Sequence, residues 1–165
     1  MENDKLITIS SAVDGAISVR AKSINLSREW VRKGAIQKIA WGDLEQIFYE
    51  QGFEYLIKTG ALYIEDAEAR QYLGLEPEGA KPEEQMIKTS DEFLKKLFDL
   101  NQMNFEQFKE VLDRMTYDQL RETIHYVVEN KITDYSRCQV LEKKTGLKVF
   151  EAVQNRIAYD NESDQ

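Results

Sequence analysis

The single histidine and the single cysteine of this 165-residue chain are the side chains with the widest chemical range. His125 could act as a general acid or base, and Cys138 could act as a nucleophile. A catalytic imidazole needs a nucleophile or an orienting acid beside it, and no motif around His125 supplies one. Cys138 falls on the apolar face of an expected helix, where a cysteine is a small core residue. We therefore interpret both side chains as structural.

The carboxylates of Glu65, Asp66 and Glu68 are the other group that could do chemistry, as ligands of a metal ion. Glu65 and Asp66 lie in an expected strand, where adjacent side chains point to opposite faces. No calcium-loop spacing supports a site made by Asp66 and Glu68. The sequence also contains neither a Walker loop nor a dinucleotide-binding glycine fingerprint. We therefore expect no enzymatic activity, no cofactor and no metal.

The composition is that of a globular protein with an acidic surface. The apolar fraction is 42%, which suffices for a packed core, and the formal charge is −8. This charge opposes non-specific binding to nucleic acid and to anionic membranes. The start, MENDKLITIS, resembles no signal peptide, and no apolar stretch reaches the length of a membrane span. We expect a soluble protein of a reducing cytoplasm.

The two prolines divide the chain. Pro77 and Pro82 lie in an acidic stretch, EPEGAKPEEQ, which is typical of a linker. Alternating β-branched residues and turn glycines precede it, and long amphipathic stretches follow. The sequence therefore predicts an α+β protein with an N-terminal α+β module at 1–75, a flexible linker at 76–87, a helical bundle at 88–159 and a disordered acidic tail at 160–165.

Residues 6–21 predict a β-hairpin around Asp14-Gly15. A two-residue loop would pair Val13 with Ala16 and place the apolar residues of the two strands on opposite faces. A three-residue loop pairs Val13 with Ile17, and we prefer it because a one-residue slip would expose half of the core. One face then carries Ile7, Ile9, Val13, Ile17, Val19 and Ala21. A further turn is expected at Lys33-Gly34.

Residues 43–59 follow helical spacing, with Asp43 as the expected N-cap and Gln46 in the capping-box position. Gly60 is expected to end this helix in the left-handed conformation. Residues 61–66 predict a short strand that buries Leu62 and Ile64, and a last helix of the module is expected to end at Gly74.

The C-terminal stretch predicts four or five short helices packed as a bundle. The expected N-caps are Ser90, Asn104, Thr116 and Asp134, and Gly146 is an expected terminator. Tyr135 is placed on the buried face of its helix. The helices on either side of Gly146 also have a helix-turn-helix outline, with Lys148, Gln154, Asn155 and Arg156 as polar groups. DNA binding stays a minor hypothesis, because the chain as a whole is acidic.

Two sets of residues are candidates for protein–protein contact. Trp30 stands in a local basic cluster, where it either caps the sheet or anchors a partner, since Trp and Arg are enriched at interface hot spots. The second set comes from the stretch EQGFEYLIKTGALYIED. Its apolar residues are assigned to the core, and Glu54, Tyr55, Tyr63 and Glu65 are expected to remain exposed. The candidates are Arg28, Trp30, Arg32, Lys33, Glu54, Tyr55, Tyr63 and Glu65.

Residues 28–79 resemble small virion structural proteins of tailed bacteriophages. The resemblance rests on Trp30 with Lys33-Gly34, on Gly52 to Leu56, on Leu62 to Asp66 and on Leu73 to Gly79. It implies a non-enzymatic head, connector or tail-associated component, present in multiple copies in the virion and in the host cytoplasm during assembly. Its partners would be other virion proteins, and membrane contact is not expected.

A function of another class stays open beside this one. A small acidic protein with two modules could instead be a phage or host regulator that binds and inhibits a partner protein. In that case its carboxylates would imitate nucleic acid and occupy a basic groove.

Overall fold

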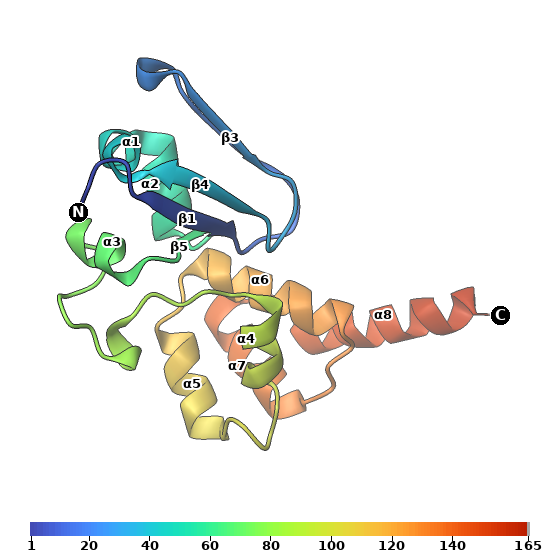
Figure 1. The fold of residues 1–165 in the computed structure, drawn as a ribbon. Coiled ribbons are helices and arrows are strands. Elements are labelled where there is room, and N and C mark those ends of the chain that lie inside the picture. Colours follow the sequence, from blue (N-terminus) through green and yellow to red (C-terminus); the bar gives the residue numbers. More distant parts are fainter. Residues whose placement is uncertain (165) are drawn as a thin grey trace. The chain divides into compact units, whose positions relative to one another are not determined.

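The computed structural model describes residues 1–164, which divide into two compact units, residues 1–90 and residues 91–164 (Figure 1). The first unit contains all five strands and three α-helices, and the second contains helices α4 to α8 among its described residues. The predicted α+β class is therefore confirmed.

A three-stranded antiparallel sheet forms the centre of the first unit. β1 (Leu6–Ser11) lies between β4 (Ile36–Ala40) and β5 (Leu62–Ile64), so both of its hydrogen-bonding edges are occupied. Ile7 is opposite Ile39 and Ile9 is opposite Ile64, and all four side chains are buried. The alternation of strand side chains thus places one face of β1, β4 and β5 in the core.

A separate two-stranded ribbon is formed by β2 (Ile17–Ala21) and β3 (Leu26–Trp30), which are joined by the short 3-10 helix η1 (Lys22–Ile24). The predicted hairpin between residues 6–13 and 17–21 is therefore wrong: β1 and β2 belong to different sheets. Local turn chemistry at Asp14-Gly15 suggested the pairing, but β1 finds both of its partners farther along the chain. The turn at Lys33-Gly34 is confirmed, since Gly34 has a φ of +83°.

The helical segment that follows β4 is broken into two helices. α1 (Trp41–Ile47) begins before Asp43, so Asp43 is not its cap. Instead, the N–H of Trp41 donates to the carbonyl of Lys5 at 2.8 Å, and the N–H of Gly42 donates to that of Asn3 at 2.9 Å. Backbone carbonyls of the N-terminal segment thus do the work of a capping side chain. α2 (Gln51–Lys58) follows after a short break.

One apolar core joins both sheets to the helices α1, α2 and α3 (Ala67–Tyr72). Its largest fully buried side chains include Trp30, Trp41 and Phe48. The Nε1–H of Trp30 donates to the carbonyl of Ile9 at 2.8 Å, which satisfies the polar atom of a buried indole. The β2–β3 ribbon is thereby fixed to the three-stranded sheet by its inner face.

Gly60 ends α2 with a φ of +87°, as predicted. We expect Gly60→Val to lower the free energy of unfolding of the first unit by about 1–2 kcal/mol, because an L side chain is disfavoured in the left-handed region. The matched control is Gly52→Ala in the first turn of α2, where an added Cβ meets no atom within 4 Å. This control should leave stability unchanged or raise it slightly. Urea unfolding of both variants makes the comparison, and equal midpoints would refute the cap assignment.

The segment predicted as a flexible linker is folded onto the first unit. Glu76 and Ile87 are buried, and the 3-10 helix η2 (Pro82–Glu84) lies between them. Glu76 Oε2 accepts hydrogen bonds from Arg70 Nε at 2.6 Å and from the backbone N–H of Met86 at 2.9 Å. The boundary between the units therefore falls after Ser90.

The second unit contains five α-helices among its described residues: α4 (Asp91–Leu97), α5 (Phe105–Asp113), α6 (Tyr117–Glu129), α7 (Tyr135–Thr145) and α8 (Val149–Ser163). The predicted N-caps at Asn104, Thr116 and Asp134 are confirmed by side-chain bonds to the third residue of each helix. Gly146 ends α7 with a φ of +75°, which is also as predicted.

Two predictions for the second unit are wrong. Tyr135 is 55% exposed rather than buried, because it lies at the very start of α7. The tail is helical up to Ser163. Asp160, placed in the predicted disordered tail, forms ion pairs with Lys131 and with Arg156, so the last turns of α8 are held by charge. Residue 165 lies outside the described part of the chain.

Candidate protein interface

The β2–β3 ribbon has an inner apolar face and an outer polar face. Trp30, Leu26 and Val19 are buried on the inner side. The outer side carries Arg20 directly opposite Ser27, with Ser18 and Glu29 as a second pair. The turn after β3 leads into β4, whose outward residues are Ile36 and Lys38. Since the inner faces of the ribbon and of β4 share one core, the outward residues of both point away from that core.

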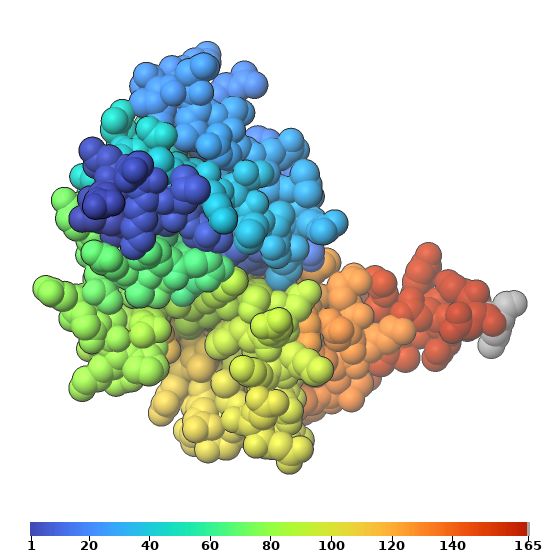
Figure 2. All heavy atoms as spheres, viewed as in Figure 1, coloured from blue at the N-terminus to red at the C-terminus, as the bar shows by residue number. Residues whose placement is uncertain are grey.

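Charge is strongly segregated in this part of the molecule. Residues 17–40 contain six Lys and Arg side chains but a single Glu, a local charge of +5 in a chain whose total is −8. Within residues 1–164, Arg20, Lys22, Arg32 and Lys38 form no salt bridge, whereas cations elsewhere commonly do, as Lys58 with Glu54 and Lys144 with Asp113. Residues 17–40 as a segment form the light-blue upper region of the surface in Figure 2.

An open trough separates β3 from β4. It is lined by Ser27, Arg28, Glu29, Ile36, Gln37 and Lys38. Instead of a regular backbone ladder, two side chains bridge the strands: Arg28 Nε donates to the carbonyl of Lys38 at 3.3 Å, and Gln37 Nε2 donates to that of Glu29 at 2.8 Å. Ile36 remains 56% exposed. An apolar side chain with cations around it is an arrangement suited to an acidic protein partner.

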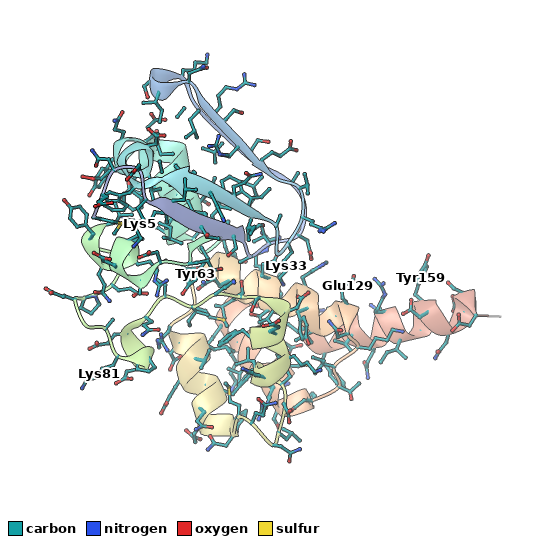
Figure 3. The ribbon with its side chains drawn as sticks, viewed as in Figure 1. Lys5, Lys33, Tyr63, Lys81, Glu129 and Tyr159 are labelled. Carbon is teal, nitrogen blue, oxygen red and sulfur yellow. The ribbon has the colours of Figure 1, made fainter. Side chains whose placement is uncertain are left out.

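The predicted basic candidates are partly brought together here. Arg28 lines the trough, and Arg32 and Lys33 follow in the turn between β3 and β4; Figure 3 labels Lys33 at this turn. Trp30, in contrast, has no exposed surface. The hypothesis that Trp30 anchors a partner is therefore wrong, and the alternative, a tryptophan that holds the sheet, is confirmed.

The second set of candidates is distributed over α2 and the far side of the sheet. Tyr55 is 62% exposed, and Glu54 pairs with Lys58 at 2.6 Å on the same helix. Tyr63 and Glu65 belong to β5 and the residue after it, at the sheet edge opposite β4. The eight candidates therefore do not form one site.

Tyr63 lies in a compact polar cluster, labelled in Figure 3. The guanidinium of Arg70 lies 4.9 Å from the centre of the ring and the ammonium of Lys88 lies 5.7 Å from it. Glu65 Oε1 accepts from Ser10 Oγ at 2.6 Å and pairs with Lys88. Burial raises the pKa of Tyr63, and the charge of Arg70 opposes that shift. Ion pairs and hydrogen bonds within the unit thus hold Glu65, Lys88 and Arg70 around the ring of Tyr63.

The two chemically versatile residues differ in their exposure. Cys138 is fully buried, and this burial raises the pKa of its thiol to about 11, so it stays protonated at neutral pH. His125 lies on the exposed side of α6. In the helix-turn-helix outline of α7 and α8, Arg156 is engaged by Glu129 and Asp160. No cluster of three or more metal-ligating side chains occurs within residues 1–164.

We call the six cations of residues 17–40, together with Ile36, the basic surface. Four of its residues were not singled out by the sequence analysis, namely Arg20, Lys22, Ile36 and Lys38. A count of charges along residues 17–40 would have found the cations, because a single acid interrupts them. Ile36 could not be found in this way, since it has no charge and its exposure depends on which face of β4 points outward.

Comparison of the chain with protein-family models, with curated proteins and with solved structures gives no match. Among the described residues, no helix combines the length and the apolar character needed to cross a bilayer. A function for this chain therefore has to be argued from its own residues.

Proposed function

We propose that this protein is a non-enzymatic assembly component of a bacteriophage particle that acts as a multi-copy adaptor through protein–protein contacts. The observation that carries the adaptor role is the basic surface of β2, β3 and β4, where Arg28 and Lys38 lie beside the exposed Ile36 and where Arg20, Lys22, Arg32 and Lys38 form no salt bridge within residues 1–164. The assignment to a particle draws on the resemblance of residues 28–79 to small virion structural proteins.

Two further features support an adaptor. Each unit has its own buried core, with Trp30, Ile9 and Leu44 in the first and Phe108, Leu141 and Val153 in the second. A protein with two such units can offer separate surfaces to two neighbours. Repetition on a symmetric scaffold lets weak single contacts suffice, because binding is multivalent.

Mass spectrometry of particles purified from the phage that encodes the chain tests this function. The wild-type protein should be recovered in many copies per particle. Arg20→Glu with Lys38→Glu should reduce incorporation at least tenfold, because these reversals place carboxylates in the basic surface. The matched control is Lys95→Glu with Arg121→Glu, which makes the same change in net charge on exposed positions of the second unit. Absence of the wild-type protein from particles would refute the proposal.

A further inference from the structure

The first unit carries an acidic surface as well as a basic one. Residues 65–84 contain seven Asp and Glu side chains but two cations, a local charge of −5. Glu76 is buried against Arg70, and Lys5 and Lys88, from outside the segment, pair with Asp66, Glu68 and Glu65. Within this segment, Glu68, Gln71, Tyr72 and Glu78 line a notch of roughly 270 Å³. Tyr72 is 64% exposed, and its ring is held edge-on against Trp41 with the ring centres 5.1 Å apart.

The two surfaces are built alike, since each has an exposed apolar side chain with charged side chains beside it. On the basic surface, the exposed apolar side chain is Ile36, and the cations Arg28 and Lys38 line the trough beside it together with one carboxylate, Glu29. On the acidic surface, the exposed apolar side chain is Tyr72 and the charges beside it are Glu68 and Glu78. An apolar centre with a charged rim of opposite sign is what two complementary sides of an interface require.

The topology keeps these surfaces apart within one molecule. β4 and β5 are the two edges of the three-stranded sheet. The ribbon is bridged to β4 by Arg28 and Gln37, whereas α3 is tied to β5 through the bond from Arg70 Nη1 to the carbonyl of Ile64 at 2.8 Å. Figure 3 labels Lys33 beside the first edge and Lys81 in the segment beyond α3. The basic surface of one molecule therefore cannot reach its own acidic surface.

From this arrangement we infer that the occupant of the basic surface is a second copy of this chain, which docks through its acidic notch. The contact is heterologous, since different patches of the two copies meet, and it leaves one free patch of each kind. Further copies add in the same direction and close into a ring or extend as a filament. The inference rests on the proposed adaptor role and names the partner of its basic surface.

Sedimentation velocity on the full chain tests self-association. We expect concentration-dependent association at low salt that weakens at least tenfold between about 0.05 and 0.5 M NaCl, because the contact is made by exposed charges. The variant with Arg20→Glu and Lys38→Glu should be monomeric alone, and so should the variant with Glu68→Lys and Glu78→Lys. An equimolar mixture should associate again, because the first variant retains its acidic notch and the second its basic surface.

The mixture separates pairing from damage to the fold, since a misfolded variant would not recover. A wild-type chain that stays monomeric at low salt would overturn the inference, as would a mixture that remains monomeric. Binding of duplex DNA by the wild-type chain, lost in the Arg20 and Lys38 variant, would also overturn it and assign the surface to phosphate. Particle membership is measured separately on virions, so failure of self-association and failure of the proposed function are distinguishable.

Discussion

Glu76→Ala is expected to lower the free energy of unfolding of the first unit by about 3–5 kcal/mol. The side chains of Arg70 and Glu76 are 5% and 0% exposed, and their Nε and Oε2 atoms are 2.6 Å apart. Removal of Glu76 leaves a buried guanidinium without its counter-charge and takes away the acceptor of the Met86 N–H. An unpaired buried charge destabilises the fold by more than the intact ion pair stabilises it.

Tryptophan fluorescence during urea unfolding measures this effect on the first unit, because Trp30 and Trp41 are the only tryptophans in the chain and both belong to that unit. Glu78→Ala, an exposed neighbour in the same segment, should change the midpoint little. Replacing the pair together, Arg70→Met with Glu76→Leu, should restore most of the lost stability. A loss below about 1 kcal/mol for Glu76→Ala would show that the pair is hydrated in solution.

Arg137→Ala is expected to lower the free energy of unfolding of the second unit by about 3–4 kcal/mol. The buried guanidinium donates to the carbonyl of Leu97 and, at 2.6 Å, to that of Met103. It also lies 5.0 Å from the ring centre of Phe108 and 3.3 Å from a carboxylate oxygen of Asp134. One side chain of α7 thus satisfies the backbone between α4 and α5.

Circular dichroism during urea unfolding measures the helices, and unchanged tryptophan fluorescence shows that the first unit is intact. Arg137→Lys should recover little stability, because an ammonium lacks the planar fork that reaches two carbonyls. Lys143→Ala, an exposed residue of the same helix, is the matched control. Wild-type stability in Arg137→Lys would contradict the role assigned to the fork.

Features that depend on a few neighbouring residues were predictable from the sequence. The capping boxes at Asn104 and Thr116 and the left-handed glycines at Gly60 and Gly146 follow from spacing alone. The cap of α1 was not predictable, because carbonyls of Asn3 and Lys5, far back in the chain, take the place of a side chain.

Features that depend on distant partners were not predictable. The composition of residues 76–87 is that of a linker, yet the buried ion pair of Glu76 with Arg70 and the burial of Ile87 hold the segment on the unit. Likewise, Trp30 stands among cations in sequence while its ring lies in the core. For the candidate interface, the positive charge of residues 28–33 could be predicted from the sequence. The trough could not be predicted, because it depends on the separation of β3 from β4 in the folded unit.

The pairing of β1 has a consequence for how fast the chain folds. β1 pairs with β4, which lies about thirty residues later in the chain, and its other edge pairs with Leu62–Ile64, which lies farther along still. The contacts among the described helices α6, α7 and α8 all close shorter loops than the pairing of β1 with β5 does. The second unit should therefore fold faster than the first, whose slow step is expected to be the pairing of β1 with β4 and β5.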